Sequence, residues 1–292
     1  MSIDSDLQLL IVEGNTPSRN AEMHASGGRA YSEVYRRVLQ AIEPQATCRV
    51  LRPCEEALDE ILKPIDLAAV DGVVLTGSTL NVYNSTRDVT RQVALFERLY
   101  AGGVPIFGSC WGLQVMATAL GGRVRRNPLG REIGIARDVQ LTAVGAEHPM
   151  YAGKPRLFDS IATHVDEVEY LPSGCSVLAK NAACAIQAAA IDDGQHSFWG
   201  VQYHPEFDLE ELTRCLRRSD AALIGEGFFE TPAELDAVCT SLLRIHSQSQ
   251  AHLARRSVYG ISDTVVDAAV RRLEIANWLG TVVGPRAAIR RG

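Results

Sequence analysis

The sequence is poor in lysine and in long apolar runs. Of its 29 basic residues only Lys63, Lys154 and Lys180 are lysines, which we attribute to coding bias rather than to a binding surface. The formal net charge of −6 argues against a nucleic-acid partner, because such proteins usually carry a basic face that displaces counterions. The acidic amino end lacks the positive charge of a secretory signal, and the apolar run that follows is far shorter than the roughly 20 residues needed to cross a bilayer. We therefore expect no membrane partner.

Paired cysteines are also missing. The seven cysteines are an odd number, and none of them forms a Cys-x-x-Cys pair. This usage is typical of a reduced, cytoplasmic chain. The 292 residues, with 46% hydrophobic and 22% charged side chains, have the composition of an ordinary globular protein that needs no disulfide or metal to hold its core.

The first half of the chain alternates between two periodicities. Short apolar runs predict strands at residues 7–13, 48–51, 72–75 and 104–107. Apolar residues at helical spacing predict helices at residues 31–42, 89–100 and 113–120. Alternation of this kind implies right-handed crossovers and a parallel sheet, so we predict an α/β fold with a mainly parallel central sheet flanked by helices.

The second half changes character twice. Residues 131–202 contain extended segments separated by turn signals, which predict a small antiparallel sheet. Beyond residue 206 the helical period returns, with a capping-box pattern at residues 231–234 and one last helix through residues 266–278. We expect a domain at residues 1–207 and a C-terminal helical extension at residues 208–292.

One cysteine lies in unusual surroundings. Cys110 follows an apolar strand and precedes a helical segment, with Gly108 and Gly112 on either side. Glycines there permit a sharp strand-to-helix turn, as in the nucleophile elbow of hydrolases. The amino end of the following helix favours a thiolate. A buried apolar cysteine is the structural alternative, but the other six cysteines lack such glycines, so we interpret Cys110 as a nucleophile.

A nucleophilic cysteine needs a base, and His204 is the best candidate. It lies where a predicted strand ends, in the order His204, Pro205, Glu206. Proline keeps the preceding residue extended, so the side chains of His204 and Glu206 can point the same way. Glu206 would then hold one imidazole nitrogen while the other faces the thiol. We expect the sulfur and the imidazole to meet in one cleft at hydrogen-bonding distance, although a histidine at a strand end is more often purely structural.

Together these segments resemble the class I glutamine amidotransferase family. Its Gly-x-Cys-x-Gly-x-Gln pattern matches Gly108 to Gln114, and its Gly-Val-Gln-aromatic-His-Pro-Glu pattern matches Gly200 to Glu206, 94 residues from Cys110 to His204. Residues 75–78, 122–134 and 163–166 resemble lesser family segments, the last of them in GMP-synthase-type glutaminase domains. The resemblance covers about residues 7–207 and implies a flavodoxin-like fold.

The resemblance also implies a mechanism. Cys110 attacks the side-chain amide of glutamine to form a γ-glutamyl thioester, His204 passes the proton to the leaving ammonia, and Glu206 orients His204. The backbone N–H groups of Gly77 and Trp111 form the oxyanion hole. The substrate's α-amino and α-carboxylate groups are held by Gln114, Thr163, His164 and Asp166. The structural alternatives are a solvated helix residue for Gln114 and a surface turn for His164 and Asp166.

The sequence is compatible with several functions. No Ser-Gly-Gly-x-Asp loop and no P-loop is present in the sequence, so we expect a free-standing glutaminase that delivers ammonia from L-glutamine to a separate synthase partner. The first alternative is a partner-independent γ-glutamyl hydrolase acting on related amides. The second alternative is a homoserine-type O-acyltransferase, which residues 110–114 and 204–208 also resemble. A binding-only descendant is the least favoured. We assign no cofactor and no metal site.

Overall fold

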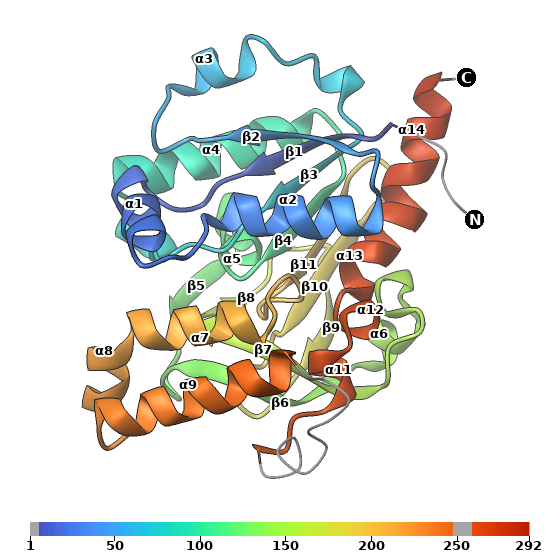
Figure 1. Ribbon diagram of the computed structural model, residues 1–292. Coiled ribbons are helices and arrows are strands. Elements are labelled where there is room, and N and C mark those ends of the chain that lie inside the picture. The colour runs from blue at the N-terminus through green and yellow to red at the C-terminus, as the bar shows by residue number, and fades with distance from the viewer. Residues whose placement is uncertain (1–5, 248–258, 292) are drawn as a thin grey trace.

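The computed structural model describes residues 6–247 and 259–291, which are built around a nine-stranded sheet in the order β2-β1-β3-β4-β11-β10-β9-β6-β7 (Figure 1). Five neighbouring strands run parallel: β2 (Thr47–Leu51), β1 (Gln8–Val12), β3 (Gly72–Leu75), β4 (Ile106–Ser109) and β11 (Ser197–Val201). The others join antiparallel: β10 (Ala188–Asp192), β9 (Ser176–Lys180), β6 (Glu132–Leu141) and β7 (Leu157–His164). The predicted α/β class is confirmed.

A separate two-stranded antiparallel sheet consists of β5 (Arg123–Arg126) and β8 (Asp166–Tyr170). Most of the extended segments predicted after residue 131 are antiparallel as expected, but β11 also pairs in parallel with β4, and most of the segments extend the central sheet. They do so because β10 hydrogen-bonds to the free edge of β11.

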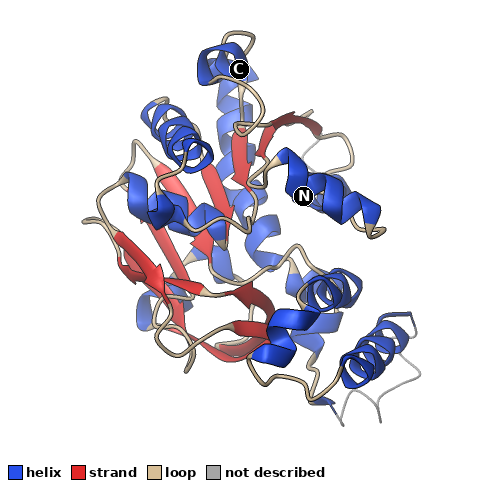
Figure 2. Ribbon diagram, turned by 90° about the vertical axis from the view of Figure 1, so that its left-hand side faces the viewer, coloured by secondary structure: helices blue, strands red, loops and turns tan. Residues whose placement is uncertain are grey.

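Helices cover both faces of the sheet, as Figure 2 shows. Alternate residues of β1 point to opposite faces, so Leu9 and Ile11 pack on one side while Leu10 and Val12 pack on the other. The helices of the first half are α1 (Pro17–Ala25), α2 (Tyr31–Ile42), α3 (Leu58–Leu62), α4 (Arg87–Ala101), α5 (Trp111–Ala119) and α6 (Ala143–Glu147). Helix α2 packs on the first face, and α4 and α5 pack on the second.

The described helices after residue 208 fall into two groups. The first group is α7 (Leu209–Arg218), α8 (Asp220–Gly225) and α9 (Pro232–Ser247), whose apolar side chains pack with Tyr31 and Val34 of α2. The second group is α11 (Asp263–Val266), α12 (Ala268–Arg271), α13 (Leu273–Trp278), η4 (Leu279–Val283) and α14 (Gly284–Arg291). No helix in the described ranges is both long and apolar enough to cross a membrane.

The expected single last helix is wrong. Asp267 has an extended backbone, and its carboxylate accepts a hydrogen bond from the N–H of Ala269, so it ends α11 and caps α12. The chain then lies across the sheet. Trp278 and Val283 are fully buried in the same hydrophobic cluster as Leu9. This segment is therefore part of the hydrophobic core against which the strands pack.

Candidate active site

Cys110 lies between the end of β4 and the start of α5. Its backbone has φ 50° and ψ −98°, a conformation that costs energy for any residue with a side chain. Its N–H donates to the carbonyl of Val201 on β11 over 2.7 Å, which holds the turn in place. A Cβ atom at Gly108 would lie 2.8 Å from the carbonyl carbon of Gly112, so the crossing of strand and helix requires glycine. The predicted elbow is present.

His204 follows β11 and is fixed from several sides. Its Nδ1 lies 2.7 Å from Oε1 of Glu206, and the hydroxyl of Ser109 donates to the same carboxylate oxygen over 2.9 Å. All three residues are buried. The ring stacks on Phe207 with centroids 4.2 Å apart. The carboxylate therefore orients the imidazole and leaves Nε2 as its free nitrogen.

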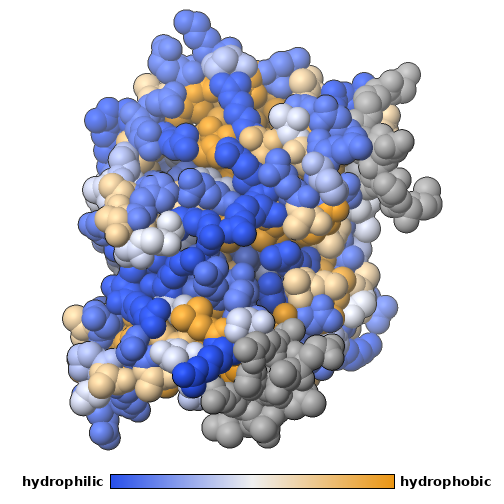
Figure 3. All heavy atoms as spheres, in the orientation of Figure 1, coloured by the Kyte–Doolittle hydropathy of each residue, from blue (hydrophilic) through white to orange (hydrophobic). Residues whose placement is uncertain are grey.

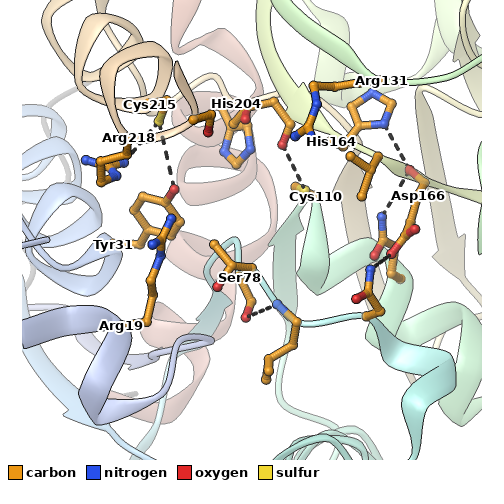
Figure 4. Close-up of a pocket in the computed structure, with 17 residues that line it drawn as sticks. Arg19, Tyr31, Ser78, Cys110, Arg131, His164, Asp166, His204, Cys215 and Arg218 are labelled. Carbon is orange, nitrogen blue, oxygen red and sulfur yellow. Dashed lines mark hydrogen bonds between the residues drawn. The ribbon is translucent and has the colours of Figure 1, made fainter. Parts of the chain in front are cut away.

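Cys110 and His204 line the same pocket, which has a volume of about 260 Å³ (Figure 4). The expected hydrogen bond between them is not formed. The thiol of Cys110 is directed at the backbone carbonyl of Thr163, 3.9 Å away, and Nε2 of His204 is buried with no hydrogen-bond partner among the described residues. A neutral thiol has no ionic attraction to the imidazole, so the nearby carbonyl competes for it.

The charge state of the thiol follows from its surroundings. Burial raises the pKa of Cys110 far above its ordinary value, and the carboxylates of Glu206 and Asp166 raise it further. The N–H of Trp111 and the side chain of Gln202 lower the pKa of Cys110, but by less. The resting thiol is therefore protonated, and forming a nucleophile requires a base beside it.

The two expected oxyanion donors both lie beside this centre. Gly77 follows β3, and a Cβ atom built on it would lie 2.8 Å from Cε1 of His204, so this loop touches the imidazole. Trp111 is the first residue of α5, where helix N–H groups have no partner within the helix. Its indole Nε1 donates to Gln92 over 2.7 Å and fixes the first turn.

The expected substrate-binding residues gather on one wall. Gln114 is buried rather than solvated, and its amide nitrogen donates to the carbonyl of Asp166 over 3.4 Å. Thr163 and His164 end β7 and Asp166 begins β8, so these residues do not form a surface turn. The pocket is lined by Gln114, Thr163, His164 and Asp166 together with Cys110 and His204.

Several residues that hold this wall in place were missed by sequence reasoning. The carboxylate of Asp166 accepts hydrogen bonds from Asn81 over 2.7 Å and from Tyr83 over 2.9 Å. The imidazole of His164 lies 2.8 Å from Glu132 through Nε2. Asn81 and Tyr83 closely follow the family-like segment at residues 75–78 and could have been sought there, whereas nothing in the sequence marks Glu132.

The opposite wall was also missed. It contains Arg19 of α1, Tyr31 of α2, and Cys215, Arg218 and Ser219 at the end of α7. The segment after residue 207 therefore reaches into the pocket.

Among the described residues, one group of side chains outside the pocket has the spacing of metal ligands. The ligand atoms of Asp208, Glu210 and His246 lie within 4.8 Å of one another. They line a hollow between α2 and α7. Figure 3 shows that a largely hydrophilic band crosses the middle of this face of the molecule. Asp208 caps α7, and Glu210 pairs with Arg214 over 2.9 Å, so structural roles already account for both carboxylates.

The fold and the pocket define a class of protein: an α/β sheet with a cysteine at a strand-to-helix elbow and a histidine–carboxylate pair at the end of the neighbouring strand. The family model described as glutamine amidotransferase class-I matches residues 30–219. The chain therefore belongs to the class I glutamine amidotransferase family.

Relatives extend this comparison. The chain is 33% identical over 287 residues to a γ-glutamyl-L-1-hydroxyisopropylamide hydrolase of a Pseudomonas species, covering 96% of this chain and 95% of that protein. It is 32% identical over 164 residues to the glutamine-hydrolysing GMP synthase of Neisseria meningitidis, covering 56% of this chain but only 30% of that protein. A glutamine amidotransferase from Thermotoga maritima shares the fold with a TM-score of 0.59 at 16% identity, covering 98% of both chains.

Proposed function

We propose that this protein hydrolyses γ-glutamyl amides through a thioester on Cys110. One observation carries the proposal: Cys110, at a strained elbow, shares a pocket with His204, whose Nδ1 is held by Glu206 while Nε2 has no partner among the described residues. A nucleophile, a base and a group that orients the base are the minimum set for acyl transfer through a covalent intermediate.

The first half of the reaction forms the thioester. The Cys110 thiol gives its proton to Nε2 of His204, and the sulfur attacks the amide carbon of the substrate. The N–H groups of Gly77 and Trp111 stabilise the oxyanion, each such donor contributing about 3 kcal/mol. His204 then gives the proton to the amine nitrogen, the C–N bond breaks, and the amine leaves.

The second half releases glutamate. Water gives a proton to His204 and attacks the thioester carbon. The C–S bond breaks, the sulfur recovers the proton, and free glutamate and the original thiol result. Glu206 stays ionised throughout and keeps Nδ1 of His204 protonated, as the carboxylate does in serine hydrolases.

The glutamyl part of the substrate is assigned to the wall of Asp166. Its carboxylate, held by Asn81 and Tyr83, suits the α-ammonium group of the substrate. Gln114, Thr163 and His164 lie beside it and complete the glutamyl site with amide, hydroxyl and imidazole groups.

We favour hydrolysis without a partner over delivery of ammonia to a synthase. The γ-glutamyl-L-1-hydroxyisopropylamide hydrolase is similar over 96% of this chain, so that match includes the segment after residue 207. The GMP synthases match only about half of this chain. Delivery of ammonia to a separate synthase is the second candidate, supported by the 32% identity with those enzymes.

Assaying the purified chain alone separates the candidates. We expect it to release glutamate and the free amine from γ-glutamyl alkylamides, and Cys110→Ala to release neither. Turnover restricted to glutamine would favour the ammonia-delivering glutaminase. Consumption of an acyl-CoA with homoserine, without amide hydrolysis, would contradict the proposal and support the acyltransferase.

A further inference from the structure

The pocket has two chemically different ends. Figure 4 shows Asp166, His164 and Arg131 on one side of Cys110, and Tyr31, Arg19 and Arg218 on the other. Asp166 is the one carboxylate among the described residues that line the pocket. Arg131 is neutralised by two hydrogen bonds to Glu226, of 2.8 and 2.9 Å. The end that contains Arg19 and Arg218 is therefore basic.

Arg218 is held in place but is not neutralised. Its Nη2 donates to the sulfur of Cys215 over 3.3 Å, and that sulfur lies 3.9 Å from the hydroxyl of Tyr31. Its Nε and Nη1 are buried and have no hydrogen-bond partner among the described residues. A guanidinium remains charged at every physiological pH, and buried donors without an acceptor are costly.

Arg19 adds a second positive charge that is only partly compensated. Its Nε is buried without a partner in the described part of the chain, and its Nη1 pairs with Glu22, whose side chain is 64% exposed. An exposed pair of this kind compensates little of the charge. Arg19 and Arg218 thus line one end of the pocket, and each has at least one buried N–H donor without a partner among the described residues.

The position of the basic end relative to His204 determines which part of the substrate lies there. In the proposed reaction His204 protonates the leaving nitrogen, so the substituent on that nitrogen extends from the imidazole side of Cys110. The ring centroid of Tyr31 lies 6.4 Å from that of His204, and Arg218 lies beyond Tyr31. The basic end is therefore where the leaving amine projects.

We propose that Arg218, with Arg19 and Tyr31, forms a leaving-group subsite that selects γ-glutamyl amides whose amine carries a carboxylate. This rests on the proposed hydrolase function. A carboxylate offers two acceptors that match the forked donors of a guanidinium, and it balances the charge of the basic end. A hydroxyl group would satisfy one donor and leave the charge uncompensated.

A substrate series on the full chain tests this subsite. It consists of γ-glutamyl amides of ω-amino acids with one to three methylenes, the matching amino alcohols and alkylamines, and glutamine. We expect kcat/KM for the best acidic substrate to exceed that for its alcohol and alkyl counterparts by about 10- to 100-fold, the range of a charge-assisted hydrogen bond. Equal or higher values for the alcohols would overturn the proposal.

The variant Arg218→Met tests whether Arg218 causes the preference for acidic substrates. It should lower kcat/KM for the acidic substrate by about 10- to 100-fold and change glutamine hydrolysis by less than about threefold. The control is Arg217→Met on the same helix, because Arg217 is 45% exposed, pairs with Asp236 and does not line the pocket. An equal loss on all substrates would mean that Arg218 serves the glutamyl group or the fold, and would overturn the subsite.

The glutamine measurement keeps the two proposals apart. If glutamine and alkylamides are hydrolysed with dependence on Cys110 but without preference for acidic amines, the subsite fails and the hydrolase stands. If no γ-glutamyl amide is hydrolysed and Cys110 cannot be acylated, the function itself fails.

Discussion

The hydroxyl of Tyr203 donates a 2.7 Å hydrogen bond to Glu274, which joins the residue before His204 to helix α13. Glu274 also pairs with Lys154 at 2.9 Å, and the hydroxyl of Tyr151 lies 2.8 Å from that of Tyr203. All four side chains are buried. The C-terminal segment therefore supports the back of the pocket through polar contacts as well as through apolar packing.

Breaking this network should be costly. The substitution Glu274→Gln leaves the ammonium of Lys154 buried without a counter-charge, which lowers the free energy of unfolding by about 3–5 kcal/mol. Urea unfolding at pH 7 measures the change. The double substitution Lys154→Met with Glu274→Leu removes both charges and should recover part of the loss. A decrease in the free energy of unfolding below about 0.5 kcal/mol in Glu274→Gln would show that the Lys154–Glu274 pair does not stabilise this segment.

The nucleophile is tested by Cys110→Ala. We expect hydrolysis of glutamine and of γ-glutamyl alkylamides to disappear while the thermal melting profile stays close to that of the natural chain, because only one sulfur is removed. The matched control is Cys184→Ala, a buried cysteine outside the pocket, which should keep its activity. Glutamate release by the Cys110 variant would refute the assignment.

Glu206 should affect turnover rather than binding. The substitution Glu206→Gln removes the charge that holds Nδ1 of His204, so we expect kcat to fall by about 10² to 10⁴-fold, as for the carboxylates of serine-hydrolase triads, with KM within about threefold. The milder Ser109→Ala removes one hydrogen bond to the same carboxylate and should cost less. Unchanged turnover in the Gln variant would remove Glu206 from the mechanism.

The raised pKa of Cys110 predicts how the reactivity of its thiol depends on pH. Burial and two carboxylates raise the pKa of this thiol above its ordinary value of 9.0, so the thiolate fraction grows only in alkaline solution. In the free protein, the rate of Cys110 alkylation by iodoacetamide, followed by peptide mass spectrometry, should rise from pH 7 to pH 9.5 without a plateau. A plateau below pH 8 would show a preformed thiolate.

Glu132 links stability to pH. Burial raises the pKa of its carboxyl, but hydrogen bonds from His164, Asn181 and Gln187 and the charge of His164 outweigh it and hold the pKa below 4.5. A carboxyl with a lowered folded-state pKa stabilises the fold above pH 4.5 and loses that contribution as the pH falls through the folded value. Glu132→Gln should therefore be less stable than the natural chain at pH 7, with a gap that shrinks below pH 4.5. A gap independent of pH would contradict this linkage.

The sequence reveals the features that depend on neighbouring residues. The elbow at Cys110 is encoded by its flanking glycines, and the pairing of His204 with Glu206 is encoded by the proline between them. The α2 helix was predicted at residues 31–42, where the structure has it, because its apolar positions follow one period. Each of these follows from geometry within a few residues.

The features that the sequence does not reveal depend on contacts between segments that are far apart in the chain. Glu132 meets His164 only because β6 and β7 pair, and Tyr203 meets Glu274 from 71 residues away. Arg218 appears in sequence as one more charged helix residue, and only the packing of α7 against α2 places it in the pocket. Periodicity also missed the break at Asp267, where a side-chain cap competes with the helix.

The most direct test is to identify the acylated residue. The purified chain is treated with a diazo-ketone analogue of glutamine, digested, and mapped by mass spectrometry with and without a γ-glutamyl amide as competitor. We predict one adduct, on the sulfur of Cys110, that the competitor suppresses and that is absent from Cys110→Ala. An adduct on another cysteine, or labelling of Cys110 that the competitor leaves unchanged, would contradict the central claim that this thiol receives the γ-glutamyl group.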